Sequence, residues 1–183
     1  MQNLPFWEED MVTHYAPFRY AEPVRGMILK LKYTGNGLVA KALAPYLAAI
    51  YLRFIQTQGK TYTLIPVPLH KSRQNERGYN QSLVLAKALA EYLNFPVLDG
   101  VLIRTRKTII QKHMDAATRA QNMRGAFTVL PERATEIKGK NLLLIDDVYT
   151  TGSTTSACRQ ALHDAGAAEI KILTVASVSF WQH

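Results

Sequence analysis

The residues best suited to chemistry lie in one stretch of thirteen, which runs from Leu142 to Thr154 and reads LLLIDDVYTTGST. Two adjacent carboxylates, Asp146 and Asp147, follow an apolar run, and burying such a pair requires a hydroxyl or a cation as partner. A loop of small residues comes next. Its backbone N–H groups and hydroxyls can surround a phosphate, and the helix that follows adds about half a positive charge at its N-terminus. The pattern indicates a ligand site.

A simpler interpretation of the same stretch is that its residues only stabilise the local backbone and bind no ligand. Ser153 or Thr154 could cap the following helix, and the acidic pair could form a solvated turn. Agreement over all thirteen positions favours a ligand site, in which Gly152 permits a close approach of the backbone. Tyr149 could stack on a base or pack beside the loop, and the sequence leaves both open.

Basic residues are in excess and are concentrated, which bears on the kind of ligand. The net charge is +8, which favours phosphate-rich partners such as nucleotides, pyrophosphate or nucleic acid over a surface that only aids solubility. Two clusters account for much of the excess. The first holds His70, Lys71, Arg73 and Arg77; the second holds Arg104, Arg106, Lys107, Lys112, His113, Arg119 and Arg124, with Asp115 as the only acid among them.

The elements that must position these residues alternate between helix and strand. Apolar periodicity predicts helices over Glu22–Tyr33, Leu38–Ile55, Tyr79–Leu93 and Ser153–Ala165, and strands over Thr61–Val67, Val97–Ile103, Ala126–Leu130, Asn141–Val148 and Ile170–Val178. This order predicts an α/β fold with a mostly parallel sheet. Ligands in such folds bind beyond the carboxyl ends of the strands, so the loop after Asn141–Val148 is the expected site.

The chain of 183 residues suits one domain, expected over residues 21–183, with residues 1–20 as an aromatic-rich N-terminal arm. Lys41 and Pro45 interrupt the longest apolar stretch, so no membrane span is expected.

A lone cysteine, Cys158, excludes an internal disulfide framework and a multi-cysteine zinc site, and we expect it to be a buried packing residue. No protein-borne metal site is predicted, and a cytoplasmic location is the default expectation.

The thirteen-residue stretch resembles the phosphoribosyl pyrophosphate (PRPP) motif of type I phosphoribosyltransferases. The resemblance implies a parallel sheet flanked by helices, with a small hood and a flexible loop over the site. It also implies that Asp146 and Asp147 bind the ribose hydroxyls, as the residues with a catalytic role. The 5′-phosphate would be held by the loop, and the substrate site as a whole would comprise Asp146, Asp147, Val148, Tyr149, Thr150, Thr151, Gly152, Ser153 and Thr154.

A narrower resemblance, to the ComF family, covers about Phe18 to Val178. It is carried by three separated blocks: LKY and the glycine at 31–35; PVPL at 66–69 with Arg73 and RGYNQ at 77–81; and Arg104, Thr105, Gln111, Arg119, Asn122, Gly125 and Phe127. The family is associated with competence, the uptake of single-stranded DNA in natural transformation, which suggests a competence helicase as partner. Its members commonly begin with a cysteine-rich, zinc-binding module; this sequence has only Cys158, so either the module is lost or the chain was cut, and zinc is not carried over.

The resemblance also implies roles for the basic residues. Lys71, Arg73 and Arg77 would face the pyrophosphate, although a solvated basic turn is the alternative. Arg104, Gln111 and Arg119 would belong to the flexible loop. Asn80 and Gln81 open a helix, and capping competes with ligand contact there.

Three functions follow as hypotheses; the third, a pure protein-interaction subunit with a dead site, stays open although the complete motif counts against it. The first is an enzyme that transfers a phosphoribosyl group and releases pyrophosphate, with Mg²⁺ held largely by substrate oxygens and an acceptor that the sequence leaves unspecified. The alternative is a single-stranded nucleic-acid-binding module that uses the site as a sensor or end-recogniser without catalysis. Since DNA lacks the 2′-hydroxyl, the acidic pair would be half satisfied by it, which favours PRPP or RNA in the pocket and DNA on the basic surface.

Overall fold

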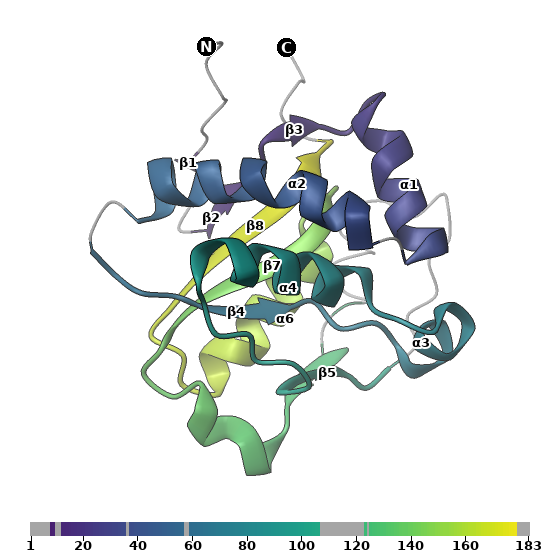
Figure 1. Ribbon diagram of the computed structural model, residues 1–183. Coiled ribbons are helices and arrows are strands. Elements are labelled where there is room, and N and C mark those ends of the chain that lie inside the picture. Colours follow the sequence, from purple (N-terminus) through teal and green to yellow (C-terminus); the bar gives the residue numbers. More distant parts are fainter. Residues whose placement is uncertain are drawn as a thin grey trace.

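A mostly parallel sheet forms the centre of the molecule, as seen in a computed structural model that describes residues 8–9, 12–35, 37–56, 59–106, 123 and 125–178 (Figure 1). Its strand order is β1-β2-β8-β7-β4, and β3 pairs with the carboxyl end of β8. Among the described strands of this sheet, only the β1–β2 pairing is antiparallel. The bounds are β1 Glu8–Glu9, β2 Val12–Tyr15, β3 Phe18–Arg19, β4 Thr63–Pro66, β7 Asn141–Tyr149 and β8 Glu169–Ser177.

The apolar run of β7 explains why the sheet is covered on both faces. Leu143 and Ile145 belong to one hydrophobic core, whereas Leu142 and Leu144 belong to a second core on the opposite face. All four side chains are fully buried. A strand that is apolar at successive positions has no face to offer to water, so helices must pack on both sides.

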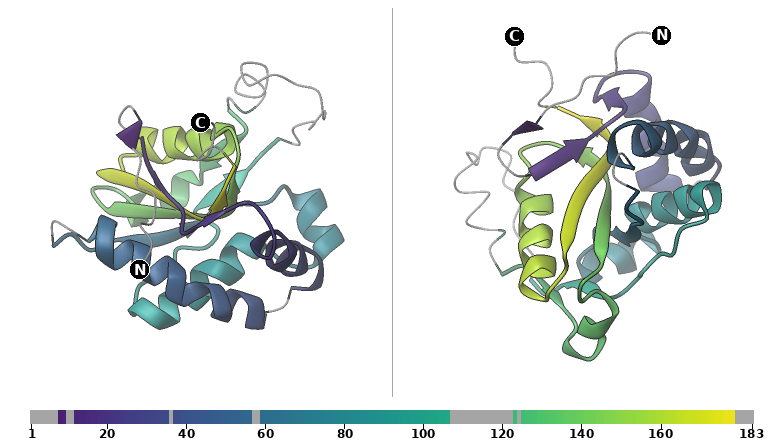
Figure 2. Two further views of the ribbon diagram at one scale, coloured as in Figure 1. Left: turned by 90° about the horizontal axis from the view of Figure 1, so that it is seen from above. Right: turned by 90° about the vertical axis from the view of Figure 1, so that its left-hand side faces the viewer.

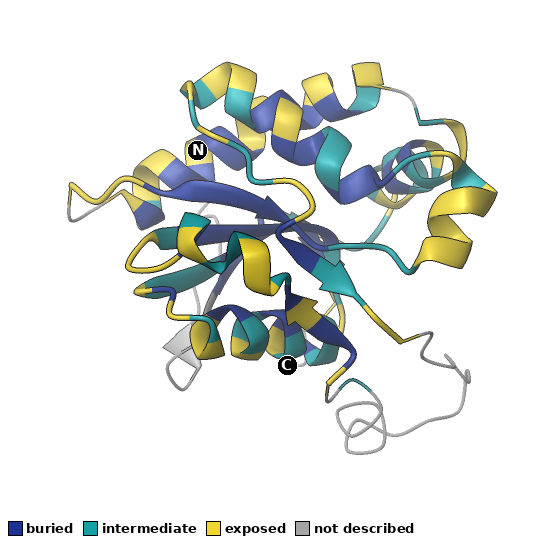
Figure 3. Ribbon diagram, turned by 90° about the horizontal axis from the view of Figure 1, so that it is seen from below, coloured by how far each residue is buried: buried dark blue, intermediate teal, exposed yellow. Residues whose placement is uncertain are grey.

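One face of the sheet is covered by helices from the first half of the chain (Figure 2). They are α1 Val24–Thr34, α2 Gly37–Ile50, the π-helical turn Tyr51–Ile55 and α4 Gln81–Leu93. The continuous segment Gly37–Ile55 is long and apolar enough to cross a membrane by composition alone, with a mean hydropathy of 1.5. Its residues Leu43 and Leu47 are nevertheless buried in the core, as expected for a helix that packs on a sheet. Figure 3 shows the helices of this layer with buried sides toward the sheet and exposed sides away from it.

The opposite face is covered by α6 Ser153–Asp164 and by a small antiparallel pair, β5 Leu102–Arg104 and β6 Phe127–Val129. A short 3-10 helix, Pro131–Glu136, follows β6. Cys158 is fully buried in this core beside Leu162, which confirms the expectation of a packing residue. The expected α/β fold with a mostly parallel sheet is therefore confirmed.

Two local features differ from the sequence-based expectations. Helix α3, Lys71–Arg77, was not predicted because its residues KSRQNER carry no apolar periodicity; the His70 side chain caps it by accepting from the Ser72 N–H at 3.2 Å. The strand expected over Val97–Ile103 is shorter, and only Leu102–Arg104 forms β5. Part of the stretch proposed as an N-terminal arm, β2 and β3, pairs with β8.

The position of α2 generates a first prediction. Replacing Leu47, which is 1% exposed, by alanine removes buried methyl groups and should lower the free energy of unfolding by about 2–5 kcal/mol. Replacing Leu38, on the same helix and 74% exposed, should change it by less than about 0.5 kcal/mol. Urea denaturation of both variants measures the difference. Equal effects at the two positions would contradict the packing of α2 on the sheet.

Candidate functional site

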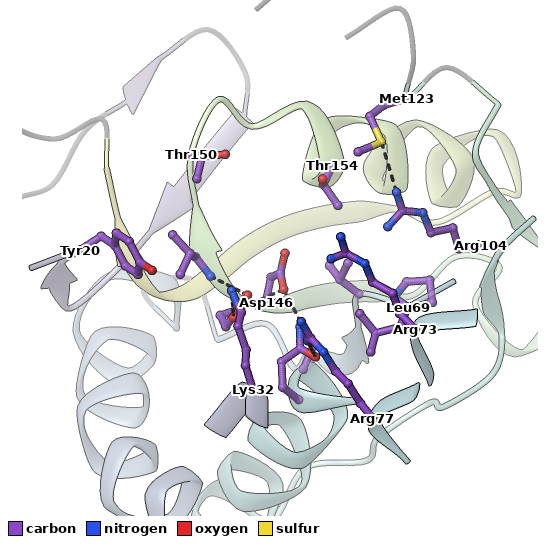
Figure 4. A pocket seen from close by; sticks show the side chains of 16 residues that line it. Tyr20, Lys32, Leu69, Arg73, Arg77, Arg104, Met123, Asp146, Thr150 and Thr154 are labelled. Atoms are coloured by element: carbon purple, nitrogen blue, oxygen red, sulfur yellow. Dashed lines mark hydrogen bonds and ion pairs between the residues drawn. The ribbon is translucent and has the colours of Figure 1, made fainter. Parts of the chain in front are cut away.

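The candidate site lies at the carboxyl edge of the sheet, where a cavity of about 280 Å³ opens beside the end of β7 (Figure 4). The segments around it are distant in sequence. They contribute Lys32 from α1, Arg73 and Arg77 from α3, Ser82 from α4, Arg104 from β5, Asp146 and Asp147 from β7, and Thr150 and Thr154 from the following loop and helix. The sequence motif and part of the first basic cluster thus meet in one place.

Asp146 and Asp147 are both buried, and the pair does not form a solvated turn. Asp146 Oδ1 accepts from the Ser82 hydroxyl at 2.9 Å and from the Asp147 N–H at 2.9 Å. Burial and then the neighbouring charge of Asp147 raise the pKa of Asp146 to about 7, against the opposing effect of those two hydrogen bonds and of Lys32. The carboxyl is therefore poised to change its protonation near neutral pH.

Asp147 has its own partners. Its Oδ1 accepts from the Val148 N–H at 3.0 Å, and its Oδ2 lies 2.6 Å from Lys32 Nζ. The carboxylate is 6% exposed and the lysine side chain 23%, so the ion pair is largely withdrawn from water. The pair ties helix α1 to the end of β7.

Lys32 and Ser82 were not assigned to the site from the sequence. A signal was present, because Lys32 belongs to the LKY triplet at 31–33 and Ser82 directly follows the RGYNQ block at 77–81. Nothing in either block shows that the two side chains converge on the acidic pair, since Lys32 and Asp147 are brought together only by the packing of α1 over the sheet.

The loop after β7 leaves the start of α6 open to a ligand. The N-cap of α6 is Gly152, in the left-handed region with φ 72°, and no side chain caps the helix. The Thr151 and Ser153 hydroxyls instead hydrogen-bond each other at 2.8 Å, and Thr155 donates to the Gly152 carbonyl at 3.0 Å. The proposed capping by Ser153 or Thr154 is therefore not seen, and the first N–H groups of the helix keep their capacity to bind an anion.

Tyr149 packs beside this loop. Its ring stacks on His14 with centroids 3.8 Å apart, and His14 Nε2 lies 2.9 Å from the Thr174 hydroxyl oxygen. Burial lowers the pKa of His14 to about 3, so this imidazole is neutral. A Cβ on Gly152 would collide with the Tyr149 hydroxyl. The close approach that Gly152 permits is thus an approach of its own backbone to the Tyr149 side chain. One face of the Tyr149 ring is covered by His14.

The basic residues divide into those that reach the cavity and those that do not. Arg73 and Arg77 line it, whereas the exposed Lys71, at the first turn of α3, is not part of the lining. Arg77 donates to Gln81 Oε1 at 3.2 Å. Arg104 lines the cavity from β5, and burial followed by the charge of Arg73 lowers its pKa. Gln111 and Arg119 lie outside the described residues.

Two side chains of the RGYNQ block serve the architecture of the site. Asn80 caps α4, because its Oδ1 accepts from the Ser82 N–H at 3.0 Å while its Nδ2 donates to the Val67 carbonyl at 3.0 Å. Capping is thus the role that Asn80 performs, and it places Ser82 against Asp146. Gln81, the other residue with two possible roles, contributes to the cavity wall.

The fold and the site define a class of protein, since residues 80–179 match the model of the phosphoribosyl transferase domain. Curated relatives then identify the family within this class. The chain is 30% identical to competence protein F of Haemophilus influenzae, over 94% of this chain and 74% of that protein. It is 32% identical to the DNA utilization protein YhgH of Escherichia coli K12, over 94% and 73%. The chain therefore belongs to the ComF family of proteins with a phosphoribosyltransferase-like domain.

Two solved structures align with most of this chain, each at a TM-score below 0.5. Glutamine phosphoribosylpyrophosphate amidotransferase of B. subtilis aligns over 80% of this chain and 30% of its own, at 21% identity and a TM-score of 0.49. Adenine phosphoribosyltransferase of Thermoanaerobacter pseudethanolicus aligns over 79% and 83%, at 12% identity and a TM-score of 0.47.

The raised pKa of Asp146 generates a second prediction. A carboxyl whose pKa is higher in the folded chain stabilises the fold below its unfolded value of 3.8, and this stability is lost as the pH rises through about 7. Asp146→Asn should therefore stabilise the ligand-free protein more at pH 8 than at pH 5, by on the order of 1–2 kcal/mol. Urea unfolding at the two pH values measures this gain.

The control is Asp99→Asn, which changes an exposed carboxylate outside the cavity. It should alter stability equally at pH 5 and pH 8. An Asp146→Asn variant that gains as much at pH 5 as at pH 8 would show that burial does not hold the proton on this carboxyl.

Proposed function

We propose that the cavity binds PRPP, a ribose with a phosphate at its 5-position and pyrophosphate at C1. One observation carries this proposal: the acidic pair of β7, the uncapped start of α6 and three arginines face the same cavity. A ligand that fits must offer hydroxyl donors beside one anionic group and present further negative charge to the arginines. PRPP has these groups in that order.

Each part of the proposed ligand has a matching part of the site. The loop Thr150–Thr154 and the first turn of α6 would hold the 5′-phosphate through backbone N–H groups and hydroxyls. Asp146 would accept from a ring hydroxyl. Arg73, Arg77 and Arg104 would hold the pyrophosphate with charge-assisted hydrogen bonds.

The residues present fit Mg²⁺ as an ion that arrives with the ligand. Among the residues that the structure describes, no group of three or more His, Cys, Asp or Glu side chains could hold a metal by itself. Asp146 Oδ2 has no hydrogen-bond partner in that part of the chain, and Mg²⁺ favours a site of one or two carboxylates plus phosphate oxygens. Bound there, the ion would neutralise charge on the pyrophosphate.

A phosphoribosyl transfer at this site would break the bond between C1 and the pyrophosphate oxygen. Positive charge develops on the ring and negative charge on the departing pyrophosphate, and preorganised charges are the main source of rate enhancement in such a step. The arginines would stabilise the leaving group, while a carboxylate at the ring would stabilise the cation. Release of pyrophosphate from PRPP in the presence of candidate bases and amines tests this chemistry.

The third prediction concerns binding itself. The double variant Asp146→Asn/Asp147→Asn removes both carboxylate acceptors, so PRPP with Mg²⁺ should bind at least about tenfold more weakly than to the wild type, a loss of about 1.4 kcal/mol or more. Isothermal titration calorimetry measures it. The matched control, Asp99→Asn/Asp164→Asn, makes the same chemical change at exposed positions and should retain wild-type affinity. Undiminished binding to the site variant would remove the proposal.

We also propose a role in DNA handling, because the relatives are named for competence and DNA utilization. Single-stranded DNA would follow the basic surface, which the net charge of +8 supports. In the ComF setting this role would serve natural transformation, with a competence helicase as partner.

The fourth prediction separates this role from the pocket. The affinity for single-stranded DNA should fall steeply as salt rises, since phosphate contacts release bound counterions. A fluorescence anisotropy titration at several salt concentrations measures the slope. The Asp146→Asn/Asp147→Asn variant should keep that affinity, because it removes negative charge and no basic group. Salt-independent binding would argue against a phosphate-backbone surface.

A further inference from the structure

Asp147 carries an ion pair before any ligand arrives, whereas Asp146 carries none within the described residues. Asp147 Oδ1 accepts from the Val148 N–H at 3.0 Å; Oδ2 is buried without a hydrogen bond among the described residues, and its charge is paired with Lys32 Nζ at 2.6 Å. On Asp146 the described residues engage only Oδ1, through Ser82 and the Asp147 N–H. A ligand therefore meets one carboxylate that is already ion-paired, Asp147, and one that is not, Asp146.

Lys32 is held in place by its surroundings. The Tyr79 hydroxyl donates to the Leu31 carbonyl at 3.0 Å and accepts from the Gly35 N–H at 2.6 Å, so it clamps the last turn of α1 on both sides of Lys32. Gly35 ends the helix at φ 60°, and a Cβ there would lie 2.8 Å from the Tyr79 ring. The clamp fixes the backbone from which the Lys32 side chain reaches Asp147, and that side chain is 23% exposed, so its ion pair is shielded from water more than a surface pair is.

This arrangement decides how the site treats a sugar that lacks one hydroxyl. A site rejects such an analogue strongly when the missing group leaves a buried polar atom unpaired. Asp147 would not be left unpaired, because Lys32 stays on its Oδ2. Only the hydroxyl that meets Asp146 would be required.

We propose that the 2-hydroxyl of the sugar lies against Asp147 and that Lys32, as a specificity-determining residue, makes this hydroxyl dispensable, so that the cavity takes 5-phosphorylated 2-deoxyribose about as well as 5-phosphorylated ribose. The inference rests on the proposed function, because it assumes that sugar phosphates bind at this cavity. It reverses the expectation drawn from the sequence, in which two free carboxylates would be half satisfied by a deoxyribose. It also extends the ligand class of the pocket to the sugar phosphate of a DNA end.

The test is displacement of PRPP, bound in the presence of Mg²⁺, by ribose 5-phosphate and by 2-deoxyribose 5-phosphate. With the wild-type chain the two inhibition constants should agree within about threefold, because neither ligand leaves Asp147 unpaired. In Lys32→Met the ligand hydroxyl becomes the only partner left for Asp147 Oδ2, so the preference for ribose should rise to about tenfold or more. Lys32→Arg keeps the cation and should restore the wild-type ratio.

The matched control is Lys30→Met, which removes the same charge from an exposed position two residues away on α1 and should leave the ratio unchanged. A preference of about tenfold or more for ribose in the wild type would overturn the inference while PRPP binding, and with it the proposed function, still stands. Displacement by neither sugar phosphate would also overturn it, since the sugar phosphate must suffice. If PRPP itself does not bind, the proposed function fails first.

Discussion

The rest of the site depends on the cost of burying two adjacent carboxylates at the end of an internal strand. Asp146 and Asp147 are 9% and 5% exposed, and a buried charge is tolerated only when it is hydrogen-bonded, paired or neutralised. The chain uses all three means. Ser82 and a backbone N–H serve Asp146, Lys32 pairs with Asp147, and burial favours the protonated form of Asp146.

This requirement links helices that are far apart in sequence. Lys32 brings α1 over the carboxyl end of β7, and Ser82 brings the first turn of α4 beneath it. Tyr79 and Asn80, which lie just before α4, hold these two contacts by fixing the end of α1 and the start of α4. The segment Tyr79–Ser82 therefore connects the helical layer to the acidic pair. These contacts explain in structural terms why the residues of the RGYNQ block are needed.

The cavity brings two carboxyl groups and three arginines together. The acids at the end of β7 face Arg73, Arg77 and Arg104 across it, and the start of α6 adds its partial positive charge. Such a division of charge suits a ligand whose hydroxyls and phosphates lie on different sides of a ring. Asp146 has a pKa near neutrality, so its protonation is sensitive to which of these groups arrives.

The sequence by itself determined the fold class, the order of the main helices and strands, and the acidic pair followed by the Thr150–Thr154 loop. These features are local, since an apolar strand, two acids and a glycine-containing turn need no distant partner to be recognised. Only the tertiary structure decided which basic residues reach the cavity, that Lys32 and Ser82 satisfy the acids, and that Tyr149 stacks on His14. It also decided that β2, β3 and α3 form, because these short segments carry no apolar period and take their shape from β8 and from the His70 cap. Contacts between residues tens of positions apart depend on how layers pack, and no spacing within one segment encodes that.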